Sequence, residues 1–103
     1  MEQEEILLNI KSKVQEEIPD AKVYLFGSRL TGNIHAESDW DILILTKEKY
    51  PKSIKNKIHE RLFPLSVLIG SSIQIILATE DEWENYPGYY SLQLGIGNQL
   101  LNL

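Results

Sequence analysis

The chain has 103 residues, 43% of them apolar, and a formal net charge of −5. This length predicts one domain over residues 1–103, because ~100–150 residues is the common domain size. The acidic balance argues against a nucleic-acid backbone as the partner, since proteins that bind one present a basic face, and the absence of cysteine excludes disulfides and thiolate zinc sites.

The first residues, Met1 to Glu5, are acidic and lack the basic-then-apolar order of a secretory leader. No apolar run in the sequence approaches the ~20 residues that are needed to span a bilayer. We therefore expect a cytoplasmic location and no membrane partner.

The first half of the chain predicts one amphipathic helix and two strands. Apolar residues recur at helical spacing over 6–18, and the Pro-Asp pair at 19–20 ends that helix. A short apolar run over 23–26 stops at Gly27 and is typical of a strand. A second strand is predicted over 41–46, where consecutive apolar residues indicate burial on both faces.

A second, longer helix is predicted over 51–69, with Gly70 as its stop. Pro64 should kink or split this helix, because proline lacks the amide proton and its ring clashes with the preceding turn. The basic run over 47–57 is interpreted as a solvated helix face.

The last part of the chain predicts a third strand over 72–78 and a short helix after it. The sequence Thr-Glu-Asp-Glu at 79–82 has the capping-box pattern of a helix start, and the Pro-Gly pair at 87–88 breaks that helix. Residues 89–103 have apolar positions at roughly helical spacing, interrupted by glycines. This element order predicts an α/β (α+β) domain, with a short mixed sheet flanked by helices.

Two acids, Asp39 and Asp41, stand at the entry to the second strand. Alternate strand residues share a face, so both carboxylates should point the same way while Trp40 and Ile42 pack on the other side. Two like charges on one face repel each other, and a cation between them would remove that cost. Oxygen ligands of this kind favour Mg²⁺ or Mn²⁺. The alternative is that the two acids are simply solvated at the start of the strand, which is the usual interpretation of an isolated Asp-x-Asp.

The Gly27-Ser28 pair directly follows the first predicted strand. Glycine lets the backbone approach a ligand closely or adopt a positive φ. The Ser28 hydroxyl and neighbouring amides can then donate to phosphate oxygens. Arg29 would add a cation there, or form a surface pair with an acid.

The stretch GSRLTGNIHAESDWDILIL, from Gly27 to Leu45, resembles the nucleotidyltransferase superfamily that includes DNA polymerase beta, and its minimal nucleotidyltransferases of the antitoxin type. The mark of this family is a strand, a Gly-Ser turn and an Asp-x-Asp that enters the next strand. The resemblance implies the nucleotidyltransferase fold, with Mg²⁺ or Mn²⁺ as cofactor and a nucleoside triphosphate, ATP foremost, as ligand. It assigns catalysis and metal binding to Asp39 and Asp41, and nucleotide binding to Gly27, Ser28, Arg29 and Ser38.

The family usually supplies a third acid from the third strand, and Gln74 stands in that slot here. Glutamine is neutral and at best a weak carbonyl ligand, so its presence should reduce turnover more than nucleotide binding. Asp81 or Glu82 could substitute, although a helix-capping role is the simpler interpretation. Gln74 among isoleucines could also form a hydrogen bond within the core or at an interface.

Three hypotheses for the function follow. The first is an Mg²⁺-dependent nucleotidyltransferase that moves NMP onto a protein or a small molecule, with turnover in doubt because of Gln74. The second is a non-catalytic, antitoxin-like module that binds a toxin of the HEPN type. The third is an orphan domain whose pocket is merely inherited.

The remaining candidates are weaker. His35 and His59 are isolated in the sequence, and no metal-ligand spacing joins them, so both are expected at the surface. Aromatic residues gather near the tail, where they predict either core packing or the surface of a homodimer or partner complex. These residues are Trp83, Tyr86, Tyr89 and Tyr90.

Overall fold

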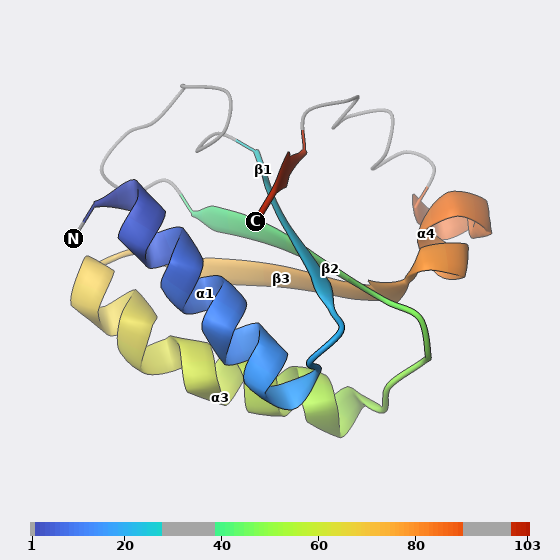
Figure 1. Cartoon of the computed structure of the whole chain (residues 1–103), viewed down its shortest axis with the longest axis horizontal. Coiled ribbons are helices and arrows are strands. Elements are labelled where there is room, and N and C mark those ends of the chain that lie inside the picture. The colour runs from blue at the N-terminus through green and yellow to red at the C-terminus, as the bar shows by residue number, and fades with distance from the viewer. Residues whose placement is uncertain (1, 28–38, 90–99) are drawn as a thin grey trace.

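The computed structural model describes residues 2–27, 39–89 and 100–103. In this part of the chain, two long helices lie side by side against one face of a sheet, and a short third helix lies at one end of it (Figure 1). The helices are α1 (Gln3–Glu17), α3 (Lys52–Ile69) and α4 (Glu80–Asn85), and the strands are β1 (Lys22–Phe26), β2 (Trp40–Thr46), β3 (Ile73–Thr79) and β4 (Leu101–Asn102).

The sheet is mixed, and its strand order is β3-β2-β1-β4. Strand β2 pairs antiparallel with β1 and parallel with β3, while β4 pairs antiparallel with the other side of β1. The parallel step from β2 to β3 is bridged by α3, as a crossover connection requires. The predicted short mixed sheet with flanking helices is therefore confirmed.

The main core lies between the sheet and the two long helices. Helix α1 buries a stripe at 6, 7, 10 and 14, and α3 buries a stripe at 58, 62 and 65. Both stripes pack against the sheet side chains that point toward them, among which Leu25, Ile42 and Ile44 are completely buried. Burying each such side chain contributes about 1.5–3 kcal/mol, so this contact fixes the helices on the sheet.

The opposite face of the sheet carries a second, smaller apolar cluster. Leu43, Leu45 and Ala78 form its centre, and half-buried aromatic side chains, including Trp83 beyond the end of β3, pack against it. Strand β2 therefore contributes to both clusters, which confirms the predicted burial on both of its faces. The same face continues toward the start of β2, where Asp41 lies.

The structure decides two details of the sequence prediction. Helix α3 runs unbroken to Ile69, so of the predicted kink or split at Pro64 the split is wrong. Pro64 is exposed, so the carbonyl that it leaves without a helical partner can turn toward water. The chain end is a strand rather than a helix, since Leu101–Asn102 pairs with β1 and the Leu103 amide donates to the Val23 carbonyl at 2.9 Å.

The predicted stop of α3 and start of α4 are confirmed. Gly70 adopts a left-handed conformation with φ of +67° at the end of α3. At the start of α4, the Thr79 hydroxyl accepts from the Glu82 amide at 3.0 Å, and the Glu82 carboxylate accepts from the Thr79 amide at 3.1 Å. Both bonds of the capping box are therefore present. No helix in the described part of the chain is long and apolar enough to cross a membrane.

Candidate functional site

Asp41 occupies the centre of the candidate site, as the second residue of β2. It pairs in register with Phe26 on β1 and with Gln74 on β3. Residues paired in register point to the same face of a sheet, so all three side chains share the face that α1 and α3 leave open. The Asp41 side chain is half-buried in this row.

Gly27 lies directly against the Asp41 carboxylate. Its φ is +80°, a conformation that residues with a side chain rarely adopt. A Cβ atom placed on Gly27 would also collide with the carboxylate oxygen of Asp41. Glycine is therefore required here for two independent reasons, and the turn that follows β1 lies against Asp41.

Asp39 precedes β2 and is exposed. Burial raises the pKa of Asp41 above its ordinary value, and the negative charge of Asp39 raises this pKa further. The two carboxylates are therefore close enough to repel each other. Between them, Trp40 points into the core beneath the helices and is 2% exposed, as the alternation of strand residues predicted.

Gln74 lies beside Asp41 and is exposed on the same face. The structure thus places this side chain next to Asp41, at the position where the family resemblance predicts a third carboxylate. Within residues 2–27, 39–89 and 100–103, no group of three or more His, Cys, Asp or Glu side chains could hold a metal ion. The described part of the site therefore offers two carboxylates and one neutral amide.

Asp81 and Glu82 lie too far from Gln74 to serve as the third carboxylate that the family resemblance predicts. They follow the far end of β3, roughly 16 Å from Gln74 at about 3.3 Å per strand residue. Glu82 closes the capping box of α4 and also pairs with Lys49 at 2.7 Å. Asp81 accepts a hydrogen bond from the Asn85 side chain at 3.0 Å. Both acids therefore have structural roles away from the site.

The other predicted site residues, Ser28, Arg29 and Ser38, lie outside the described residues, as does His35. His59 is exposed on α3, in agreement with the expected surface position.

The fold and this row of side chains define a class of protein: a small mixed-sheet domain with an acidic pair at a strand entry beside a glycine turn. A family profile described as "Nucleotidyltransferase domain" matches residues 7–88. This match covers most of the chain and spans both aspartates, the glycine turn and β3. The chain belongs to the nucleotidyltransferase domain family.

Two kinds of curated relative match about half of the chain. The spectinomycin 9-adenylyltransferase of Staphylococcus aureus is 38% identical over 50 residues, which are 48% of this chain and 19% of that protein. The protein adenylyltransferase MntA of Aphanizomenon flos-aquae is 47% identical over 52 residues, which are 48% of this chain and 35% of that protein. The matched segment thus spans about a fifth to a third of these relatives.

Two solved structures share the fold. One is a toxin–antitoxin complex crystallised with AMP-PNP, with a TM-score of 0.56 and 22% identity over 74% of this chain and 57% of that one. The other is a crystal structure assigned as a nucleotidyltransferase, with a TM-score of 0.55 and 21% identity over 94% of this chain and 96% of that one. The second match extends over nearly the whole of both chains, and it confirms the predicted nucleotidyltransferase fold.

Proposed function

We propose that residues 1–103 act as one nucleotidyltransferase domain that binds a nucleoside triphosphate, ATP foremost, together with Mg²⁺ or Mn²⁺. Asp39 and Asp41 hold the ion in this proposal, and transfer of NMP to an acceptor is slow or absent. The observation that carries the proposal is the position of Asp41, between Phe26 and Gln74 on the open face and in contact with Gly27.

The donor atoms of the site suit a hard divalent cation. Asp41 and Asp39 supply carboxylate oxygens, and their mutual repulsion would be relieved by a bound cation. When bound, such an ion neutralises phosphate charge and polarises the phosphoryl group. The backbone at Gly27 has no side chain to keep a phosphate away, so the phosphates can approach the turn closely. Ser28, Arg29 and Ser38 remain the proposed nucleotide contacts.

The glutamine at position 74, where the family usually has a carboxylate, affects nucleotidyl transfer more than nucleotide binding. In nucleotidyl transfer, an acceptor hydroxyl attacks the α-phosphorus, the bond to pyrophosphate breaks, and the hydroxyl proton must go to a base. A carboxylate beside Asp41 could take this proton, whereas the amide of Gln74 has no basic site at neutral pH. Binding needs only oxygen ligands, and the triphosphate itself supplies several of them.

The acceptor is open to two classes of molecule. The named activities of the relatives include transfer to a small molecule, spectinomycin, and transfer to a protein. An acceptor of either class would have to be held by surfaces beyond the matched segment. We therefore propose adenylyl transfer as the reaction type, to a protein or a small molecule, should the domain turn over.

A non-catalytic antitoxin-like module is the second candidate, and Gln74 specifically favours it. A site that binds nucleotide without a third carboxylate could stabilise a partner complex instead of performing transfer. One structural neighbour is a toxin–antitoxin complex crystallised with AMP-PNP. In this alternative, the partner is a HEPN-type protein.

Isothermal titration separates these proposals from an inherited, inactive pocket. Wild type should bind Mg²⁺-ATP weakly, and Asp39→Ala should abolish binding because it leaves Asp41 alone to hold the ion. Glu48→Ala, at an exposed acid after β2, is the matched control and should bind as wild type does. If wild type gives no heat with any nucleoside triphosphate and either metal, the nucleotide-binding proposal is wrong.

A transfer assay with labelled ATP decides between the enzyme and the module. Little or no label should reach an acceptor in the presence of Mg²⁺. Transfer by wild type at an ordinary enzymatic rate, ~1 s⁻¹ or more, would show that Gln74 does not limit the chemistry.

A further inference from the structure

Helix α3 passes beside strand β3, and we use the term groove for the strip of surface between these two elements that joins two pockets. Two pockets, of about 280 and 290 Å³, lie along it at opposite ends of β3. The α3 side chains that line them follow one another at helical spacing and form a single stripe. This stripe consists of Lys52, Lys55, His59, Leu62, Phe63 and Ser66. The two pockets are therefore parts of one surface that follows both elements.

Strand β3 presents a free edge along this groove. Only β2 pairs with it among the strands in the described part of the chain. The Trp40 amide donates to the Ser72 carbonyl at 2.9 Å, so the even-numbered residues of β3 face β2 in the parallel ladder. The odd-numbered residues Ile73, Ile75 and Leu77 therefore direct their N–H and C=O groups away from the sheet.

The sequence of β3, IQIILAT, contains no charged residue and no proline. Natural proteins usually protect an exposed edge with lysine, proline, a bulge or a very short strand, because an open edge pairs readily with another chain. Strand β3 has seven residues and none of these residue types. Its edge is therefore suited to accept an added strand.

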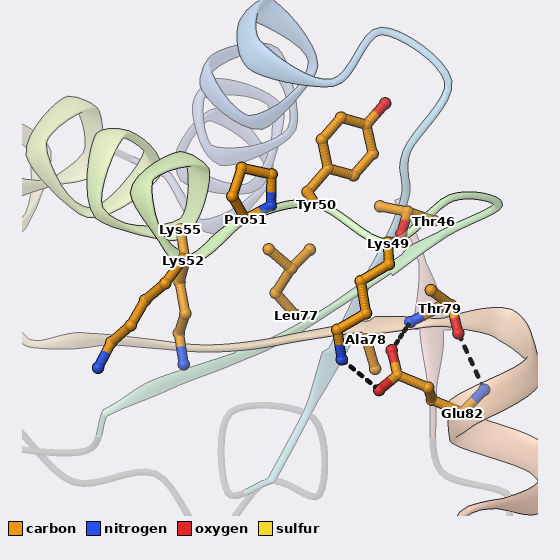
Figure 2. Close-up of a pocket in the computed structure, with 10 residues that line it drawn as sticks. All are labelled: Thr46, Lys49, Tyr50, Pro51, Lys52, Lys55, Leu77, Ala78, Thr79 and Glu82. Carbon is orange, nitrogen blue, oxygen red and sulfur yellow. Dashed lines mark hydrogen bonds and ion pairs between the residues drawn. The ribbon is translucent and has the colours of Figure 1, made fainter.

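The pocket at the end of β3 is basic. Lys52 and Lys55 project from the first turns of α3 in the same direction, while Lys49 is already paired with Glu82 at 2.7 Å (Figure 2). The first turn of α3 holds no acidic residue. Two ammonium groups beside the positive end of a helix dipole, in a chain of net charge −5, favour a carboxylate as their partner.

The pocket at the start of β3 is lined by both polar and apolar side chains, with no lysine, arginine or acid among the described residues that line it. Leu62, Phe63 and Ile73 contribute to its lining, and Phe63 is 66% exposed. An exposed phenylalanine in a concave site gains by packing against an apolar side chain, because this removes apolar surface from water. The groove therefore presents two different chemistries at its two ends.

We propose that this groove binds an extended peptide segment of a partner protein, which adds an antiparallel strand to β3. The peptide carries an acidic residue opposite Leu77 and a large apolar residue four positions later, opposite Ile73. Leu77 and Ile73 lie on the same face of β3, about 13 Å apart at 3.3 Å per residue. The backbone edge supplies affinity, and the two pockets supply sequence preference.

Selection from a displayed library of random eight-residue peptides tests the proposal without a known partner. The full chain should enrich peptides with Asp or Glu followed four positions later by Leu, Ile, Phe or Trp. A library that gives no enrichment, or enriches peptides without this spacing, would overturn the proposal.

A proline at Leu77 tests the backbone pairing of the enriched peptides. The Leu77 amide points away from β2, so Leu77→Pro leaves the ladder to β2 intact while removing an outward donor. It should weaken peptide binding about tenfold or more, because one hydrogen bond is lost and the ring obstructs the added strand. Leu77→Ala, which keeps the amide, is the matched control and should bind far better than Leu77→Pro. Equal binding by the two variants would contradict strand addition.

A charge reversal on the surface provides a test that does not depend on β3 tolerating a proline. The double variant Lys52→Glu/Lys55→Glu should lose the acidic peptides and gain a peptide in which lysine replaces the acid. Unchanged preference would overturn the role of the basic pocket. Sedimentation of the free chain tests whether a second copy of the chain, rather than a peptide, occupies this edge. A wild-type dimer that Leu77→Pro dissociates would assign the edge to a second copy and overturn the peptide proposal.

Discussion

Asp41 is central both to the structure of the site and to the proposed metal binding. It is half-buried between two strands, faces a glycine that could not be replaced without collision, and lies near a second carboxylate. Its environment penalises the charged form of the carboxylate, which is the form that binds a cation. The charged carboxylate therefore costs some folding stability, and a bound cation would offset that cost.

Because the charged form of Asp41 is penalised in the folded state, a neutral residue at this position should stabilise the protein. The pKa of Asp41 is raised above 3.8 in the folded state, so the folded chain holds this proton more tightly than the unfolded chain. Ionisation at neutral pH therefore lowers stability, and Asp41→Asn should raise the free energy of unfolding at pH 7 by up to about 1 kcal/mol, a small gain because the group is partly open to water.

Urea unfolding at two pH values checks this sign. The gain from Asp41→Asn should fade near pH ~3, where the carboxyl is protonated in both states. Asp20→Asn, at an exposed acid in the turn between α1 and β1, serves as the control. A destabilised Asp41→Asn at pH 7 would show that the Asp41 charge is favourably paired, contrary to its environment.

The pKa of Asp41 also predicts how metal binding depends on pH. A cation must displace the proton from a carboxylate whose pKa is raised, so binding releases protons as pH approaches this pKa. The apparent Mg²⁺ affinity should therefore fall as pH is lowered toward the raised pKa of Asp41. Titration of Mg²⁺-ATP at several pH values measures this, and a pH-independent affinity would argue that Asp41 is not a ligand.

Gln74 is the second site residue for which a substitution gives a clear prediction. Gln74→Asp would place a third carboxylate beside Asp41 in register, and the added anion should strengthen metal binding by about tenfold. It should also lower stability in the absence of metal, because a third like charge joins the pair. Titration with Mn²⁺ and thermal unfolding with and without metal measure both effects. Gln74→Asn, which stays neutral, should change neither.

At the scale of elements, the join between β3 and α4 depends on Thr79. Its hydroxyl caps α4 while its amide binds Glu82, which in turn is held by Lys49. Loss of such a cap costs about 1 kcal/mol. Thr79→Ala should lower the free energy of unfolding by this amount, and Thr79→Ser, which keeps the hydroxyl, should recover most of it. Chemical denaturation of the two variants distinguishes the cap from the loss of a buried methyl group.

The helices also show what sequence patterns can and cannot predict. The periodicity of apolar residues located α1, α3 and the buried stripe of each, because burial drives both the pattern and the packing. The same patterns interpreted Lys52 and Lys55 as a solvated helix face. Periodicity indicates which side of a helix is buried, but not that a sheet edge lies beside its polar side, and the groove was therefore missed.

At the scale of the whole molecule, the candidate site was predictable in its parts but not in its assembly. Spacing and family resemblance pointed to Gly27, Asp39, Asp41 and Gln74, and the structure brings Gly27 and Gln74 to Asp41. The parallel register that places Gln74 beside Asp41 depends on α3 carrying the chain back across the sheet, which is a long-range arrangement. Strand β4 has only two residues, too few for any alternating pattern.

The tail aromatics bear on whether the molecule associates with itself. Tyr89 lies between Trp83 and Tyr86, with ring centroids 5.6 and 5.8 Å away, and packs with Trp83 against the open face of the sheet. Tyr86 is 58% exposed. Intramolecular packing therefore accounts for Trp83 and Tyr89, whereas Tyr86 is the most exposed of the tail aromatics that the structure describes. Tyr90 lies outside the described residues.

This division predicts different effects for the two tyrosines. Tyr89→Ala should lower the free energy of unfolding by about 2 kcal/mol, because it removes a partly buried ring and two aromatic contacts. Tyr86→Ala should change stability by less than about 0.5 kcal/mol but weaken self-association if the aromatic segment forms a dimer. Sedimentation velocity over a range of concentrations measures the second effect. A dimer that is unaffected by Tyr86→Ala would place the dimer contact elsewhere. A wild-type monomer at high concentration would show that the aromatic segment does not form a dimer.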